Sequence, residues 1–298
     1  MISDPSYYRD ESSLFHPAGA GINKALISVL ILTLNEKFDL PGCLDSVSWS
    51  DDVHVFDSNS TDGTQDLARS RGAALYERQF DDYAAHRNAA FDTVPFRYPW
   101  VLLLDADERV TPELASELLR AVASPASKAA AAYRLRRRDF LFDTWLKHAQ
   151  ISPFYIRLVR PERARYTRSI NEVLEIQGAV EQLTTPLDHF PFSKGFAHWI
   201  SKHNRYSSME ARLIVSQQGL QRPSVKAALC SRDFHERRMH QKAFFYQLPA
   251  RPLLKWIYMV VVRRAFLDGR AGLTYAALQA IYEYMIVLKT REYRRGLA

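Results

Sequence analysis

Two carboxylates stand one residue apart directly after a run of apolar residues. Residues 101–108 read VLLLDADE, so Asp105 and Asp107 follow four apolar side chains. Such a run predicts a strand that is buried on both faces of a parallel sheet. Open α/β sheets bind ligands beyond the carboxyl ends of their strands, and two carboxylates placed there can bind one divalent cation, which can then bind a diphosphate. The alternative is a solvated turn in which Asp107 helps to cap the following helix.

The segments around this pair alternate between strand and helix patterns. Strands are predicted over residues 25–34, 52–56, 73–76, 101–104, 133–138 and 154–159. Helices are predicted over residues 40–47, 65–71, 83–92, 196–218 and 272–288, and another apolar segment covers 249–267. The alternation in the first half predicts an α/β fold with a mostly parallel sheet and helical crossovers.

Charge is distributed unevenly along the 298 residues. Residues 191–298 hold 19 Lys and Arg against six Asp and Glu, a net charge of +13, whereas residues 1–190 hold 21 against 27, a net charge of −6. Two surfaces with different partners are therefore expected. The two cysteines, Cys43 and Cys230, have no metal-binding spacing, which favours a reducing compartment.

The start of the chain and its apolar segments bear on membrane insertion. Residues 1–24 are polar and lack the pattern of a signal peptide, so we expect a loose N-terminal arm. No segment has the roughly 18–20 uninterrupted apolar residues that indicate a membrane span.

Four phrases carry a resemblance to a known family. They are SVLILTLNE at 28–36, DSNSTDGT at 57–64, HRN at 86–88 and DAD at 105–107. In this order they resemble the family 2 glycosyltransferases, which use a nucleotide-sugar-binding, Rossmann-like fold called GT-A. Further phrases at 140–148, 157–160 and 266–269 resemble the branch that adds glucose or related sugars to the lipopolysaccharide core of bacteria. The resemblance implies an inverting hexosyltransferase.

The resemblance also assigns a donor site. Its nucleotide-sugar-binding residues would be Leu32, Thr33, Leu34, Glu36, Asp57, Ser58, Arg87, Asn88 and Asp105. Backbone groups and carboxylates can pair with the base and ribose, most simply of a UDP-sugar, and a guanidinium suits a diphosphate. Many family members have a second carboxylate where this chain has Ser58, which leaves the nucleotide open. The alternative roles are turn formation for Asp57 and surface ion pairing for Arg87.

A divalent cation, Mg²⁺ or Mn²⁺, is implied at the acidic pair. Asp107 would be the direct ligand, and Asp105 would be shared with the ribose. A histidine after the acceptor region often completes the metal site in GT-A enzymes, so His189 is the candidate third ligand. The alternative for His189 is a structural role.

The acceptor side is assigned to residues 133–190. Glu172 is the candidate general base, because a carboxylate there can take the proton of the acceptor hydroxyl. Relatives often carry histidine where this chain has Asn171, and Asp139 is the reserve candidate. Trp145 and His148 could form an acceptor platform or simply pack. Arg157 is placed near the phosphates.

The basic C-terminal region has a pattern typical of membrane interfaces. The apolar run 256–262 lies between Lys255 and the pair Arg263 and Arg264. Aromatic and basic residues around a short apolar run suit a helix that lies on anionic lipid head groups. Packing on the core or against a second copy in a homo-oligomer is the alternative. The expected organisation is an arm over 1–24, a GT-A domain over 25–190 and a helical membrane-associating or oligomerising region over 191–298.

These features together predict a metal-dependent, inverting glycosyltransferase. It would move a sugar from a nucleotide-diphosphate donor to a lipid-linked, lipopolysaccharide or polysaccharide acceptor, in the cytoplasm at the cytoplasmic face of the inner membrane. The alternative is a noncatalytic sugar-nucleotide-binding or scaffold relative. A haloacid-dehalogenase-like phosphatase is disfavoured, because two strand–helix units precede the DAD phrase. Nucleic acid is not an expected partner, because charge is its only support.

Overall fold

The computed structural model describes residues 26–167, 173–216, 224–231, 234–246 and 248–296. The predicted N-terminal arm and the candidate base Glu172 lie outside these residues.

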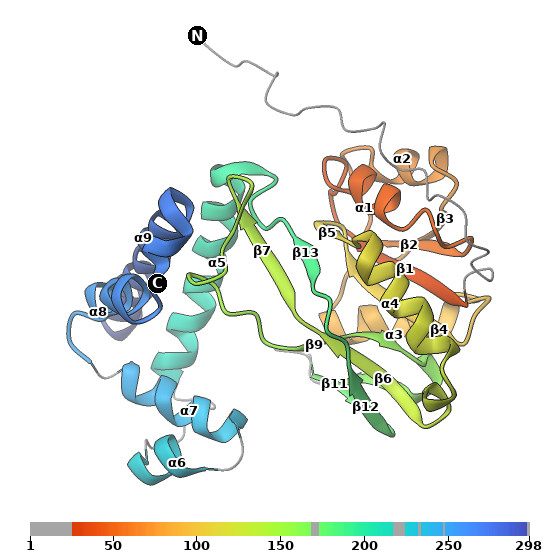
Figure 1. Cartoon of the computed structure of the whole chain (residues 1–298). Helices are drawn as coiled ribbons and strands as arrows, with labels where there is room; N and C mark the ends of the chain where they lie inside the picture. The colour runs from red at the N-terminus through yellow and green to blue at the C-terminus, as the bar shows by residue number, and fades with distance from the viewer. Residues whose placement is uncertain (1–25, 168–172, 217–223, 232–233, 247, 297–298) are drawn as a thin grey trace.

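A seven-stranded sheet forms the centre of the molecule, with the order β12-β6-β9-β4-β1-β2-β3 (Figure 1). Its strands are β1 (Ile27–Thr33), β2 (Val53–Asp57), β3 (Ala74–Glu77), β4 (Trp100–Asp105), β6 (Ala130–Leu135), β9 (Tyr155–Val159) and β12 (Ala179–Gln182). β1 to β4 run parallel, whereas β9 is antiparallel to both β4 and β6. The predicted α/β fold with a mostly parallel sheet is confirmed.

The apolar runs of β1 and β4 are explained by helices and strands on both faces of the sheet. Ile31 and Leu102 belong to the core on the side that holds α1 (Leu40–Ser46) and α4 (Pro112–Ala123). Leu30 and Leu103 belong to the core on the other side, which is formed with α3 (Tyr83–Thr93) and the β10–β11 hairpin (Ala164–Thr167 and Val173–Ile176). Because successive side chains of a strand point to opposite faces, both cores require apolar residues in sequence.

A smaller sheet of order β5-β13-β7-β8 extends the central one towards the helical region. Its strands are β5 (Glu108–Arg109), β13 (Leu187–His189), β7 (Arg137–Leu141) and β8 (Thr144–Trp145). β13 places His189 opposite Glu108 of β5 and opposite Asp139 of β7. The register of this three-residue strand therefore decides what His189 contacts.

The C-terminal helices pack on one another, and α5 lies between the others and the small sheet (Figure 1). They are α5 (Gly195–Ser216), α6 (Val225–Cys230), α7 (Phe234–Phe245), α8 (Arg251–Ile257), a π-helical turn (Tyr258–Val262), a 3₁₀ turn (Ala265–Asp268) and α9 (Gly269–Arg294). Helix α2 (Thr64–Ser70) and the 3₁₀ turns Pro125–Lys128 and Pro161–Arg163 complete the described elements.

Two features fix the start of α9. The Asp268 carboxylate accepts hydrogen bonds from the backbone N–H groups of His148 and Ala149, at 2.8 and 2.7 Å. A Cβ atom on Gly272 would lie 2.0 Å from the carbonyl oxygen of Ala265, so the start of α9 requires glycine there. Both features lie in or beside the phrase at 266–269, which therefore has a structural role.

The apolar content of the C-terminal region has two readings in the structure. In the described part of the chain, the segment Ala265–Arg294 is long and apolar enough to cross a membrane, and 33% of its most apolar stretch is buried. The same helix packs on α5 and α8, and it carries the buried Glu283, which pairs with Arg251 at 3.2 Å. Packing of this kind explains the buried part of its apolar residues, whereas Leu273, Ile281 and Leu288 stay exposed.

Candidate active site

A cleft of about 1180 Å³ lies at the carboxyl ends of β1, β2 and β4 and is lined on its other side by α5. Most of the predicted site residues line it: Leu32, Thr33, Leu34, Glu36, Ser58, Arg87, Asp105, Asp107 and His189. Asp57 and Asn88 are absent from this lining, and Glu172 is outside the described residues.

Asp57 is fully buried and is directed at its own loop. Its carboxylate accepts hydrogen bonds from the Thr33 hydroxyl at 2.6 Å, the Ser60 N–H at 2.7 Å and the Gln65 amide at 2.8 Å. These hydrogen bonds agree with the alternative role given for Asp57, which is turn formation rather than nucleotide binding. Asp57 thus holds the loop that presents Ser58 to the cleft.

Asn88 and Arg87 face different surroundings although they are neighbours. The Asn88 amide donates to the carbonyl of Tyr166 at 2.8 Å and accepts from its N–H at 2.9 Å, so it fastens α3 to β10. Arg87 lies over the Tyr166 ring and reaches the cleft, where one guanidinium nitrogen is 3.6 Å from Asp105. Only Arg87 of this pair can contact a ligand in the cleft.

Buried charges form a network directly behind the cleft. Arg157 lies 2.9 Å from the Asp105 carboxylate and 2.5 Å from that of Glu108. Glu108 is fully buried, accepts from the N–H of Asp105 at 3.0 Å and lies 3.5 Å from Arg137. Burial disfavours the charged form of Asp105, but Arg157 and Arg87 outweigh it and hold the pKa of Asp105 below its usual value. Asp105 is therefore a carboxylate bound by arginines.

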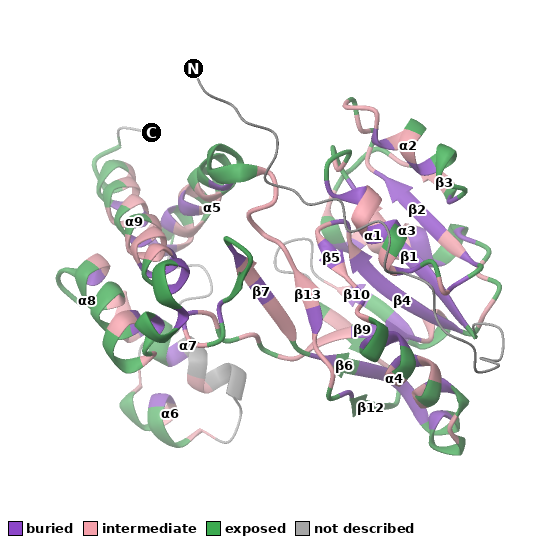
Figure 2. Ribbon diagram, turned by 45° about the horizontal axis from the view of Figure 1, so that its top comes forward, coloured by how far each residue is buried: buried purple, intermediate pink, exposed green. Residues whose placement is uncertain are grey.

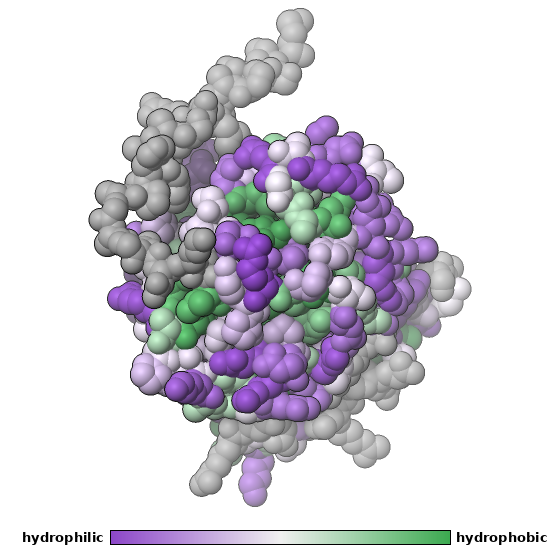
Figure 3. All heavy atoms as spheres, turned by 90° about the vertical axis from the view of Figure 1, so that its right-hand side faces the viewer, coloured by the Kyte–Doolittle hydropathy of each residue, from purple (hydrophilic) through white to green (hydrophobic). Residues whose placement is uncertain are grey.

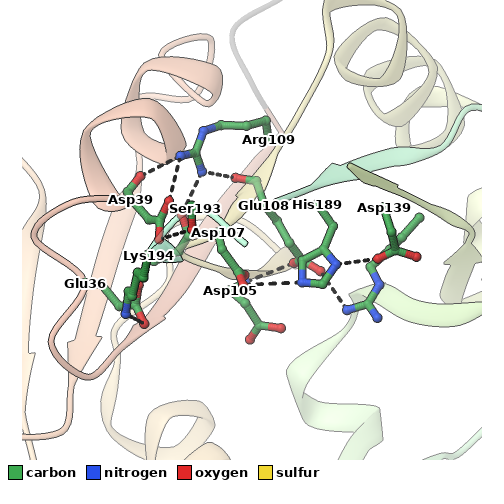
Figure 4. A network of polar contacts seen from close by, with 12 residues as sticks. Glu36, Asp39, Asp105, Asp107, Glu108, Arg109, Asp139, His189, Ser193 and Lys194 are labelled. Atoms are coloured by element: carbon green, nitrogen blue, oxygen red, sulfur yellow. Dashed lines mark hydrogen bonds and ion pairs between the residues drawn. The ribbon is translucent and has the colours of Figure 1, made fainter. Parts of the chain in front are cut away.

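His189 links the second carboxylate of the pair to β7 (Figure 4). Its Nε2 is 3.3 Å from Asp107, and its Nδ1 is 2.5 Å from Asp139. Burial lowers the pKa of His189, but the two carboxylates outweigh it and raise this pKa to about 9. Without a metal ion the two carboxylates thus favour the imidazolium form, and a divalent cation that bound Nε2 would have to displace its proton.

The residues around Asp107 fit a divalent cation in part. The described residues contain no group of three His, Cys, Asp or Glu side chains arranged around a common point. Asp107 and the Nε2 of His189 are close enough to share one ion, and a carboxylate on the other ring nitrogen is the usual support of a metal-binding histidine. Water and a diphosphate oxygen would have to supply the remaining ligands, as Mg²⁺ commonly allows.

Helix α5 and the turn before it contribute residues that sequence reasoning did not assign to the site. Lys194 lies 2.6 Å from the Glu36 carboxylate (Figure 4), and Ser193 donates to Asp39 at 2.7 Å. Burial raises the pKa of Glu36 to about 7, although Lys194 opposes this shift. Further along α5, the lining includes His198, Ser201, Lys202 and Arg205. The spacing of these four residues along one face of α5 is the sequence signal that could have indicated them.

Comparisons with known proteins agree with this arrangement. The family model described as "Glycosyl transferase family 2" matches residues 28–179. The lipopolysaccharide core biosynthesis glycosyltransferase LpsC of Rhizobium meliloti is 30% identical over 203 residues, which cover 64% of this chain and 72% of that protein. An uncharacterized glycosyltransferase of Rickettsia typhi is 24% identical over 279 residues, which cover 89% and 87% of the two chains.

Solved structures also match in part. The crystal structure of glucosyl-3-phosphoglycerate synthase from Mycobacterium tuberculosis is similar with 21% sequence identity and a TM-score of 0.33, over 38% of this chain and 44% of that one. The family model covers half of the present chain, and it includes β1 to β4 with both predicted acidic positions. The chain therefore belongs to glycosyl transferase family 2 and is a glycosyltransferase with the GT-A fold.

Proposed function

We propose that this glycosyltransferase transfers a hexose from a nucleoside-diphosphate sugar, most simply a UDP-sugar, to a saccharide of the lipopolysaccharide type, with inversion and with help from a divalent cation. The observation that carries the proposal is the position of Asp107 and His189 in the same cleft as Arg87 and Arg137. The cleft thus combines oxygen and nitrogen ligands for a cation with guanidinium groups for a diphosphate. The name of the Rhizobium relative supports the acceptor class.

The donor is proposed to lie against the ends of β1 and β2. The backbone at Leu32–Leu34 and the Glu36 side chain line that part of the cleft and would pair with the base and ribose. Arg87 would bind the diphosphate, and Asp107 with His189 would hold the cation. When bound, the cation neutralises charge that develops on the departing diphosphate.

The proposed reaction is a single displacement at the anomeric carbon. The acceptor hydroxyl oxygen forms the new bond, and the bond to the diphosphate oxygen breaks with its electron pair on that oxygen. Glu172 remains the proposed base that takes the hydroxyl proton. Asp139 is the reserve: one of its oxygens binds His189, and the other is buried without a hydrogen-bond partner among the described residues. Comparing Glu172→Gln with Asp139→Asn separates the two roles.

Titration calorimetry with a panel of nucleoside diphosphates and their sugars, with Mn²⁺, Mg²⁺ or chelator, tests the donor site. One nucleotide should bind in a cation-dependent manner, and Asp107→Asn should weaken that binding and lower transfer by about 100-fold or more. Asp66→Asn, an exposed change on α2, is the matched control. Equal, cation-independent binding by wild type and Asp107→Asn would refute the metal role. Absence of nucleotide binding by the folded protein would favour a scaffold.

We further propose that the enzyme docks on an anionic bilayer through an apolar patch on its C-terminal helices. The patch consists of side chains that are each at least 40% exposed: Leu253, Trp256, Ile257, Tyr258, Val261, Val262, Phe266 and Leu267. The basic residues Lys255, Arg264 and Arg270 lie within or beside it in sequence, which suits an interface with acidic head groups. On the opposite face, by contrast, hydrophilic residues separate the apolar areas into small pieces (Figure 3).

Vesicle flotation tests the docking proposal and the expected location at the cytoplasmic face of the inner membrane. The protein should float with vesicles that contain acidic lipid, less with neutral vesicles, and not after the double change Val261→Glu and Val262→Glu. A concentration-dependent dimer that the same double change dissociates, without flotation, would show that a second copy covers the patch.

A further inference from the structure

One face of α5, with the turn that leads into it, presents a row of basic groups to the cleft. Lys194, His198, Lys202 and Arg205 follow one another at intervals of four, four and three residues, and all of them line the cleft. Such spacing places them along one side of the helix. The row begins beside Glu36, on the donor side, and continues away from it along α5.

The far end of this row has no ion-pair partner among the described residues, although the charge of Lys202 acts on Asp107 across the cleft. Lys194 pairs with Glu36, but neither Lys202 nor Arg205 forms an ion pair with any residue that the structure describes. The pKa of His198 is lowered by burial and by Lys194 and Lys202, in agreement with a positive potential along this face. A cleft wall that carries more positive than negative charge attracts anions.

A smaller hollow of about 110 Å³ adjoins the cleft at the same place. Its lining combines aromatic rings, including Trp199 and Tyr275, with polar groups, including Asp139, His189, Lys202 and Gln279. Aromatic faces and amide groups suit a sugar ring, which has apolar C–H faces and hydroxyl edges. Lys202 lines both the cleft and the hollow.

The position of the hollow distinguishes it from the donor side. Figure 4 shows Glu36 and Lys194 at one end of the polar network and Asp139 at the other, with Asp107 and His189 between them. Asp139 and His189 line the hollow, whereas Glu36 does not. A ligand in the hollow would therefore approach the reacting centre from the side opposite the donor's base.

We propose that this hollow and the far end of the α5 row form an acceptor subsite for an anionic sugar. The sugar ring would occupy the hollow, and its phosphate or carboxylate group would bind Lys202, with Arg205 adding to the attraction. This inference rests on the proposed transferase function and names the chemistry of the acceptor. Phosphate and carboxylate share the required charge, and the experiment below separates them.

Binding of small sugars in the presence of saturating UDP and Mg²⁺ tests the subsite without knowledge of the full acceptor. Glucose 6-phosphate or glucuronate should bind at least about tenfold more tightly than glucose, which corresponds to roughly 1.4 kcal/mol. Lys202→Gln should remove that preference, Arg205→Gln should reduce it, and both variants should bind UDP as wild type does. Arg212→Gln on α5, whose side chain lies over Tyr293, is the matched control.

Each outcome of this experiment supports a different conclusion. A preference for glucose 6-phosphate alone or for glucuronate alone identifies the acidic group. Equal binding of all three sugars, or no binding of any of them while UDP binds, would overturn the subsite. Weaker UDP binding by Lys202→Gln would instead assign the row to the donor diphosphate. Failure of UDP and of every other nucleotide to bind wild type would refute the proposed function itself.

Discussion

The central sheet and the C-terminal helices bury their residues to different extents. β1 and β4 are buried along almost their whole length, whereas α8 and the turns that follow it expose most of their apolar side chains (Figure 2). Buried charge differs as well. Arg157 contacts two carboxylates behind the cleft, whereas Arg251 contacts only Glu283 among the described carboxylates. The donor half is therefore fixed by many mutual contacts, and the helical half has surface left for a partner.

The largest effect is expected from Arg157→Leu. Asp105 and Glu108 would lose the cation that both contact, and Glu108 is fully buried. We expect a loss of about 3–5 kcal/mol in the free energy of unfolding, measured by chemical denaturation. Arg165→Leu, which removes an exposed ion pair with Asp92, is the control. A loss below 1 kcal/mol for Arg157→Leu would contradict the proposal that buried ion pairs stabilise the central sheet more than the C-terminal helices.

Arg251→Leu should have a smaller effect of the same kind. Burial already raises the pKa of Glu283, so this carboxyl can take up a proton when its partner is removed. We expect a loss of about 1–3 kcal/mol, and the loss should shrink as the pH falls. A loss equal to that of Arg157→Leu at every pH would show that the helices depend on their buried pair as strongly as the sheet does.

Glu36→Gln should change how stability varies with pH at the junction of the two halves. The folded pKa of about 7 lies above the ordinary value of 4.5 for a glutamate, so wild type has the full contribution of this group below about pH 4.5 and loses it as the pH rises through 7. The Glu36→Gln variant has no carboxyl group to ionise at this position, so it does not lose this stability. Between pH 5 and 8, the denaturation midpoint of the variant should therefore rise relative to that of wild type as the pH increases. The exposed change Glu162→Gln should give a constant difference, and a constant difference for Glu36→Gln would contradict the prediction.

The smallest effect is expected from the double change Val261→Ser and Val262→Ser. Both side chains are more than 60% exposed, so each should alter the free energy of unfolding by less than about 0.5 kcal/mol. The same variant should bind acidic vesicles more weakly. A large loss of stability without lipid would mean that the patch packs on another part of the protein or on a second copy.

Much of the donor half could be predicted from the sequence because its signals are local. The run before Asp105 was long and apolar enough to indicate a strand with two covered faces, and β4 spans Trp100–Asp105. The start of helix α5 was also predicted within one residue. In these segments the pattern of apolar residues depends on the secondary structure alone.

Side-chain direction was harder to predict, because it depends on competing hydrogen bonds. Asp57 turns towards Ser60 and Gln65, and Asn88 pairs with the backbone of Tyr166 across 78 residues. The contact of Lys194 with Glu36 joins residues still further apart. The apolar segment 249–267 was predicted as one unit, yet it divides at Arg264, whose φ of 57° interrupts the helical geometry. None of these features has a local pattern.

The register of β13 has a consequence for insertions and deletions. His189 faces Asp107 and Asp139, whereas the preceding residue, Asp188, pairs with Arg138. Side chains alternate along a strand, so a shift by one residue would replace the imidazole at the cleft by Asp188 after an insertion or by Phe190 after a deletion. The segment 183–186 that leads into β13 should therefore tolerate substitutions better than insertions or deletions. Family members that vary in this segment should vary by substitution, and an engineered single-residue deletion there should abolish transfer while β1 to β4 still fold.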